Sequence, residues 1–126
     1  MKNTTAIILA AGRGTRMRTS GPKVLYEVCG VTLLECVINA VRMAEISKII
    51  IVIGDKKEEV RDSLKGIPVE VAVQREQLGT AHAVTSAKHL LPSTTDTVLI
   101  LNGDTPLIKP QTVKKLIAVN REYEPI

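Results

Sequence analysis

Aromatic residues are almost absent from this chain of 126 residues, which has two tyrosines, no phenylalanine and no tryptophan. Proteins that read single-stranded nucleic acids stack the bases on aromatic side chains, so this class is disfavoured and no nucleic-acid partner is expected. The apolar fraction is nonetheless 44%, as in globular domains. The core must therefore be built from aliphatic side chains.

Long apolar runs are also missing. No run approaches the ~20 residues that a helix needs to cross a bilayer, and residues 6–11 are too short for a secretory leader and precede arginines. We therefore expect a cytoplasmic protein with no membrane partner. Cys29 and Cys36 lack histidine neighbours and metal-type spacing, so we interpret them as buried or partly buried thiols rather than a disulfide or a ligand pair.

Acidic residues are absent from the first 26 positions, which hold five cations. The whole chain carries a net charge of +4, so the remainder sums to −1. The basic surplus is local and coincides with the stretch Gly12-Arg13-Gly14-Thr15-Arg16, directly after an apolar run. A local positive field steers small anions, whereas proteins that bind duplexes more often spread their cations over a face or a helix.

This glycine-rich stretch predicts a loop that binds phosphate. Glycine lets backbone N–H groups turn toward an anion, and the arginines together with Lys23 neutralise it. Ala10 and Ala11 keep the preceding strand end flat, so a base or ribose could lie close to the main chain. The dinucleotide fingerprint and the Walker A pattern both fail here. From spacing alone, an ordinary tight turn with solvated arginines remains the alternative.

Apolar periodicity predicts strands that alternate with helices. The strands are expected at residues 5–10, 48–53, 69–73 and 96–101. The helices are expected at about 32–44, 55–65 and 80–91, and from Pro110 onward with Val113, Leu116 and Ile117 inside. Thr32 with Glu35 and Asp55 with Glu58 are typical capping boxes.

This alternation predicts an α/β fold of the Rossmann-like type, in which three layers (α/β/α) surround a mostly parallel sheet with right-handed crossovers. We expect the strand order 3-2-1-4. This order reverses between strands one and four, and ligands bind at such a switch point, beyond the carboxyl ends of the strands. The loops that meet there span 11–23 and 102–106, so the glycine loop and Asp104 are expected to face one site.

Three segments resemble the sugar-phosphate nucleotidyltransferase family, in the family's order and spacing. They are Leu9-Ala10-Ala11-Gly12-Arg13-Gly14-Thr15-Arg16-Met17 with Pro22-Lys23, then Gln74-Arg75-Glu76-Gln77-Leu78-Gly79-Thr80-Ala81-His82-Ala83, and Leu101-Asn102-Gly103-Asp104-Thr105-Pro106-Leu107. The double alanine and the Gln-Leu-Gly-Thr segment are most similar to the uridylyltransferase domains of bacterial bifunctional N-acetylglucosamine-1-phosphate uridylyltransferases. The resemblance covers essentially the whole chain, but only about the first half of such a domain.

The resemblance implies a role for each matching residue. The residues that would contact the uridine are Leu9, Ala10, Ala11 and Gly12, with Gly14 in the same nucleotide-binding loop. The residues that would read the uracil ring are Gln74, Gln77, Gly79 and Thr80. Arg16 and Lys23 would bind the triphosphate and the transferring phosphoryl group, and Asp104 would hold Mg²⁺. His82 and His89 are interpreted as structural or surface residues, because no serine–acid arrangement accompanies them.

The resemblance further implies a Mg²⁺-dependent enzyme of peptidoglycan precursor synthesis. It would transfer UMP from UTP to N-acetylglucosamine-1-phosphate, giving UDP-N-acetylglucosamine and pyrophosphate. Residues 1–126 would be the nucleotide-binding half, with no counterpart of the sugar-binding half or of the acetyltransferase domain. Two alternatives stay open: a non-catalytic nucleotide-binding module, and a nucleotidyltransferase for another sugar- or alcohol-phosphate. An apolar surface where the missing half should pack could drive self-association into a homo-oligomer.

Overall fold

The computed structural model of the chain describes residues 3–11, 22–54, 58–76, 78–105 and 107–122. Strands and helices alternate along it, as the apolar periodicity predicts. The elements are β1 (Thr4–Ala10), η1 (Lys23–Leu25), β2 (Glu27–Val28), β3 (Val31–Thr32), α1 (Leu33–Met43), β4 (Lys48–Gly54), α2 (Glu58–Ser63), β5 (Glu70–Gln74), α3 (Thr80–Ser86), η2 (Lys88–Leu90), β6 (Thr97–Asn102) and α4 (Pro110–Glu122).

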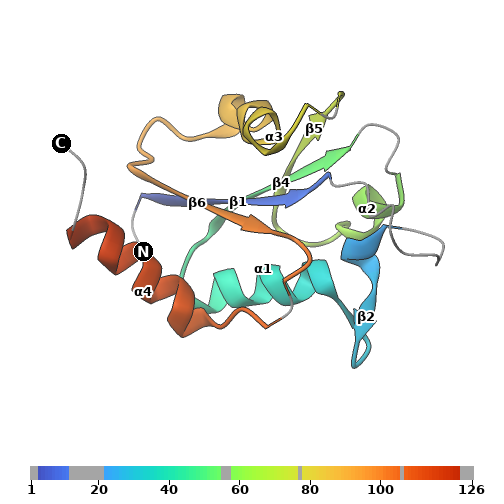
Figure 1. The fold of residues 1–126 in the computed structure, drawn as a ribbon, viewed down its shortest axis with the longest axis horizontal. Helices are drawn as coiled ribbons and strands as arrows, with labels where there is room; N and C mark the ends of the chain where they lie inside the picture. Colours follow the sequence, from blue (N-terminus) through green and yellow to red (C-terminus); the bar gives the residue numbers. More distant parts are fainter. Residues whose placement is uncertain (1–2, 12–21, 55–57, 77, 106, 123–126) are drawn as a thin grey trace.

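The main sheet has four strands in the order β5-β4-β1-β6, and every pair in it is parallel. This confirms the expected order 3-2-1-4. Helices α1 and α4 lie on one side of the sheet and α3 on the other, which gives the three expected layers (Figure 1). The short strands β2 and β3 form a separate antiparallel hairpin. None of the described helices has the length and apolarity needed to cross a membrane.

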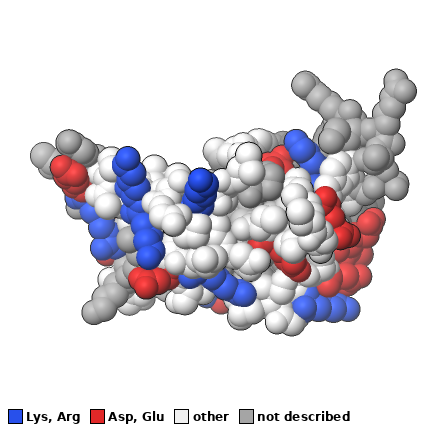
Figure 2. Space-filling view, turned by 90° about the horizontal axis from the view of Figure 1, so that it is seen from below, with Lys and Arg blue, Asp and Glu red and all other residues white. Residues whose placement is uncertain are grey.

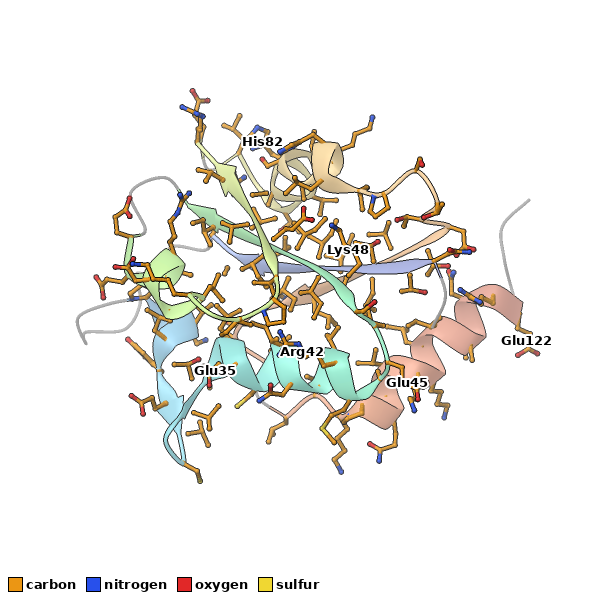
Figure 3. All side chains as sticks on the ribbon, turned by 180° about the vertical axis from the view of Figure 1, so that it is seen from behind. Glu35, Arg42, Glu45, Lys48, His82 and Glu122 are labelled. Atoms are coloured by element: carbon orange, nitrogen blue, oxygen red, sulfur yellow. The ribbon has the colours of Figure 1, made fainter. Side chains whose placement is uncertain are left out.

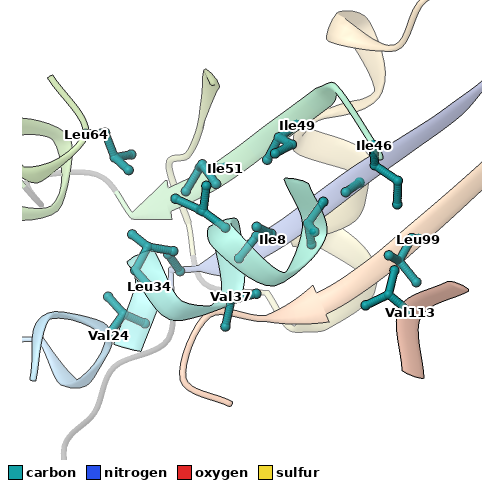
Figure 4. Close-up of a cluster of buried hydrophobic side chains, with 14 of the residues drawn as sticks. Ile8, Val24, Leu34, Val37, Ile46, Ile49, Ile51, Leu64, Leu99 and Val113 are labelled. Carbon is teal, nitrogen blue, oxygen red and sulfur yellow. The ribbon is translucent and has the colours of Figure 1, made fainter. Parts of the chain in front are cut away.

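Successive residues of the central strands contribute their side chains alternately to two aliphatic cores, one on each face of the sheet. Ile8 and Ile51 belong to the core beneath α1 and α4, and Ile7 and Ile50 to the core beneath α3. Figure 4 shows the first core, in which Val37 of α1 packs among residues of the sheet. Because successive side chains of a strand point to opposite faces, a strand that is apolar throughout has to be covered on both sides.

The helix start at Thr32 is confirmed in atomic detail. The Thr32 Oγ1 atom accepts a hydrogen bond from the backbone N–H of Glu35 at 3.1 Å. Such a cap stabilises a helix by about 1 kcal/mol. The second expected cap, Asp55, lies outside the described residues.

The helix expected over residues 80–91 is shorter than predicted, because α3 ends at Ser86 and a separate 3₁₀ turn, η2, follows. The hydroxyls of Thr85 and Ser86 donate to the carbonyl oxygens of Ala81 and His82, each at 3.0 Å. Hydroxyl side chains that bond back to the preceding turn compete with the helical backbone ladder. In α4, Val113 and Ile117 are buried as expected, but Leu116 is 53% exposed.

The prediction of a buried or partly buried Cys29 was wrong, since Cys29 is exposed, whereas Cys36 is half-buried as expected. Cys29 and Gly30 form the turn between β2 and β3 and both have positive φ angles, 54° and 81°. Two left-handed residues in sequence are typical of a tight hairpin turn, which places the side chain at its tip in solvent.

The face covered by α1 and α4 carries its charges in two groups (Figure 2). Lysine and arginine side chains gather toward the end where α4 lies, and most of the carboxylates gather toward the opposite end. Helix α4 contributes Lys114, Lys115 and Arg121 to the basic end. Both ends also carry some side chains of the opposite charge.

Gly103 is the point where the chain leaving β6 touches β1. Its backbone N–H donates to the carbonyl oxygen of Leu9 at 2.9 Å. A Cβ atom added at this position would lie 3.1 Å from that oxygen, 3.2 Å from Leu34 Cδ1 and 3.3 Å from Val24 Cγ1. A side chain at this position would therefore require these neighbours to shift by a few tenths of an ångström.

We expect Gly103→Ala to destabilise the chain by about 1–3 kcal/mol, because the added methyl group overpacks this contact. The free energy of unfolding, measured by urea denaturation, checks this. The control is Asn39→Ala on the exposed side of α1, for which a change within about 0.5 kcal/mol is expected. Equal stability of Gly103→Ala and the control would contradict the close approach.

Candidate functional site

The carboxyl ends of all four strands of the main sheet lie at the same edge. The pairing places Leu9 beside Asn102, Ala10 beside Ile53 and Gly54 beside Gln74. The chain order reverses between β1 and β6, because the chain leaves β1 for β4 on one side and reaches β6 last, on the other. Parallel α/β sheets bind ligands at this kind of crevice.

Lys23 and Asp104 meet at this switch point. Lys23 begins η1, and Asp104 lies in the turn after β6. The distance from Lys23 Nζ to Asp104 Oδ2 is 3.4 Å, and the two side chains are 44% and 35% exposed. The sequence predicted both residues at one site, and the structure brings them together.

Buried neighbours hold each partner of this ion pair in place. Val24, next to Lys23, belongs to the core beneath α1, and Gly103, next to Asp104, is bonded to Leu9. The Thr105 hydroxyl donates to the carbonyl oxygen of Asn102 at 2.9 Å and so closes the turn that carries Asp104. The backbone segments that carry the two charged groups are thus anchored.

The donor set at Asp104 fits a divalent cation that arrives with its substrate. Within the described ranges there is no group of three or more histidine, cysteine, aspartate or glutamate residues that could hold a metal ion. Magnesium usually takes one or two carboxylates and fills its remaining positions with water and with the phosphates of its substrate. The accessible carboxylate of Asp104 is consistent with this mode of binding.

A second polar cluster lies two strands away from β1, where β5 meets α3. Gln74 ends β5 and is only 3% exposed. Its Nε2 atom lies 3.3 Å from the carbonyl oxygen of Gly79 and 3.0 Å from His82 Nδ1. Gly79 precedes α3 with φ 102° and ψ 176°, a conformation that favours glycine. The structure therefore brings Gln74 into contact with Gly79, which directly precedes Thr80 at the start of α3.

His82 was expected to be structural or surface, and its half-buried position agrees with this. It lies in the first turn of α3, and its Nδ1 atom contacts the side-chain amide of Gln74, a contact that sequence reasoning did not predict (Figure 3). His89, on η2, is exposed. The sequence did hold a signal for this contact. His82 lies two residues after the start of a helix that follows a strand, and a side chain at such a position can point back toward the end of that strand.

The remaining expected residues divide into two groups. Ala10 and Ala11 are 3% and 4% exposed at the end of β1, and Leu9 is half-buried beside them. This is consistent with a flat strand end that offers main chain rather than side chains. Gly12, Gly14, Arg16 and Gln77 lie outside the described residues.

A curated relative shares much of this sequence. The chain is 48% identical over 115 residues to "Bifunctional protein GlmU" of Clostridium perfringens, an alignment that covers 91% of this chain and 25% of that protein. The chain thus spans about a quarter of the length of this relative.

Solved structures share the fold. A nucleotidyl transferase from Methanothermobacter superposes with a TM-score of 0.83 at 26% identity, covering 94% of this chain and 58% of that one. Rv0371c of Mycobacterium tuberculosis in complex with manganese superposes with a TM-score of 0.78 at 24% identity, covering 95% of this chain and 60% of that one.

A protein-family model matches nearly the whole chain. The family model described as "MobA-like NTP transferase domain" matches residues 6–125. The match includes all four strands of the main sheet except the first residues of β1, and it includes both polar clusters at its carboxyl edge. The chain therefore belongs to the MobA-like NTP transferase domain family.

Proposed function

We propose that this chain is the nucleotide-binding half of a Mg²⁺-dependent uridylyltransferase, which transfers UMP from UTP to N-acetylglucosamine-1-phosphate. The products are UDP-N-acetylglucosamine and pyrophosphate. The observation that carries the proposal is the approach of Lys23 Nζ to Asp104 Oδ2, 3.4 Å apart at the switch point. A cation and a carboxylate at this position are what a metal-bound triphosphate requires. The resemblance of three segments to uridylyltransferases supports the choice of base and acceptor.

The two polar clusters suit the two ends of a nucleotide. Gln74 ends β5 and Asp104 follows β6, with β4 and β1 between them. Three steps between neighbouring strands, each about 4.8 Å, separate these ends by about 14 Å. A nucleoside triphosphate laid across the strand ends places its base at Gln74 and its phosphates at Lys23. The main chain at the end of β1 lies between them, where the ribose belongs.

In the proposed reaction an oxygen of the sugar-1-phosphate attacks the α-phosphorus of UTP. A new P–O bond forms, the bond from the α-phosphorus to the bridging oxygen breaks, and pyrophosphate leaves with that electron pair. The protein's task is positioning and charge neutralisation. Lys23 would bind the phosphates, and Asp104 would hold Mg²⁺, which when bound supplies further neutralisation of their charge.

The ion pair between Lys23 and Asp104 opens at little cost. Both side chains are more than a third exposed, and pairs of this kind contribute between about 0 and 1 kcal/mol to stability. A charge-assisted hydrogen bond from Lys23 to phosphate contributes about 1.5–3 kcal/mol. Exchange of partners is therefore favourable once the nucleotide arrives. The manganese complex of Rv0371c supports the use of a divalent cation on this fold.

A second candidate function is a nucleotide-binding module without turnover. It is favoured by the absence, among the described residues, of any group of three or more histidine, cysteine, aspartate or glutamate side chains that could hold a metal ion. A transferase for another sugar- or alcohol-phosphate is the third. All three bind a nucleotide at the same strand ends and differ in whether it reacts and with which acceptor.

Isothermal titration calorimetry with UTP tests the nucleotide site. We expect Lys23→Gln to weaken UTP binding about tenfold or more, because one phosphate contact is lost. The control is Lys115→Gln, which removes the charge of an exposed lysine on α4 and should leave binding unchanged. Equal affinities of wild type and Lys23→Gln would remove Lys23 from the phosphate site.

The same titration with and without Mg²⁺ tests Asp104. We expect Mg²⁺ to tighten UTP binding by the wild type, and Asp104→Asn to lose most of that gain because the amide is a weaker ligand than the carboxylate. Binding of UTP without the metal should weaken little in this variant. An undiminished effect of Mg²⁺ in Asp104→Asn would show that the cation is held elsewhere.

A pyrophosphate-release assay separates the candidate functions. We expect UTP binding in every case and, under the proposal, pyrophosphate that forms only when UTP, Mg²⁺ and N-acetylglucosamine-1-phosphate are all present. Binding of UTP without pyrophosphate supports the module, and release with a different acceptor phosphate supports the third candidate. Absence of both binding and release rejects all three.

A further inference from the structure

Gln74 and His82 form a polar contact that the proposed reaction does not yet use. The amide of Gln74, at the end of β5, reaches the first turn of α3 and touches two groups there. Its Nε2 atom lies 3.3 Å from Gly79 O and 3.0 Å from His82 Nδ1. The side chain is nearly enclosed, at 3% exposure.

The orientation of this amide follows from its neighbours. A backbone carbonyl oxygen can only accept hydrogen bonds, so the amide atom that faces Gly79 must be the NH₂ group and not Oε1. One N–H is thereby directed to Gly79, and the second is left for His82. His82 Nδ1 must then accept through its lone pair, which places the ring proton on Nε2.

This arrangement decides what Gln74 can offer a ligand. Both hydrogens of its amide are committed to Gly79 and His82, so any further contact of this side chain is made by Oε1, which only accepts. The Watson–Crick edge of uracil presents a donor, N3–H, between two carbonyl oxygens. Cytosine presents an acceptor at N3, whose lone pair would face Oε1. Two acceptor atoms that face each other without a hydrogen between them cost more binding free energy than the loss of a single hydrogen bond.

We propose that His82 is a positioning residue that holds the Gln74 amide with its acceptor toward the base, and so makes the site select uracil over cytosine. This inference rests on the proposed function, in which UTP places its base at the end of β5. His82 then acts through Gln74 and needs no contact of its own with the substrate. Without the acceptor at His82 Nδ1, the amide is no longer locked in one orientation and can present its NH₂ group to cytosine N3.

The first test compares UTP and CTP binding by calorimetry in three variants. His82→Leu removes the acceptor and is expected to lower the ratio of UTP affinity to CTP affinity at least tenfold. His82→Asn is expected to restore most of that ratio, because the Asn Oδ1 atom can accept at the position of the histidine Nδ1. The control is His89→Leu on η2, which is exposed and should leave the ratio at the wild-type value.

The ratio of UTP affinity to CTP affinity in these variants either supports or overturns the inference. An unchanged ratio in His82→Leu overturns the inference, and so does a ratio in His82→Asn as low as in His82→Leu. A merely structural role would weaken both nucleotides alike and leave the ratio unchanged. Urea denaturation of each variant establishes that it is folded, and the asparagine variant keeps the test available if the leucine variant does not fold.

A second test uses no nucleotide. The chain has two histidines, so the ring ¹⁵N signals of His82 in a long-range ¹H–¹⁵N spectrum are identified by their loss in His82→Asn. We expect the tautomer with a bare Nδ1 and a proton on Nε2. A proton on Nδ1 overturns the inference whether or not UTP binds. The expected tautomer in a chain that binds no nucleotide instead overturns the proposed function and leaves the contact standing.

Discussion

The parallel pairing of β1 with β4 and β6 is the constraint on which the rest of the structure depends. Ile7 lies opposite Ile50 on one side and Ile100 on the other, so β1 occupies the middle of the sheet. Burying one such side chain contributes about 1.5–3 kcal/mol, and β1 and β4 are buried along almost their whole length. Because all pairs are parallel, this burial also brings the ends of the four strands to one edge, near Lys23, Gln74 and Asp104.

The interactions that stabilise this fold differ from the polar contacts at the candidate site. The aliphatic cores and the contact of Gly103 with Leu9 fix where the strand ends lie. The ion pair at the edge is partly exposed and contributes little to stability. The amide of Gln74 is the opposite case, since it is enclosed and held by two partners. The side chains of Lys23 and Asp104 are thus weakly held, whereas the side chain of Gln74 is fixed in one position.

The sequence predicted those features that depend on neighbouring residues or on apolar periodicity. The runs of β-branched residues gave the strands and their order, and Thr32 with Glu35 gave the start of α1. The meeting of Lys23 with Asp104 followed from the switch point and from the family resemblance. The end of α3 escaped prediction because it depends on hydroxyl groups that bond within the helix. The contact of His82 with Gln74 escaped because it depends on how α3 is rotated against β5.

The outer strand of the sheet has a consequence for the site. Strand β6 has a neighbour on one side only among the described residues, carries no charged side chain, and leaves Val98 and Ile100 39% and 45% exposed. In natural sheets, lysine or proline on an edge strand commonly prevents it from pairing with another chain. An edge strand of this kind is a template on which another extended segment can pair. A strand that pairs with β6 would also contact the element that leads into the turn of Asp104, so pairing at this edge would restrict the motion of that turn.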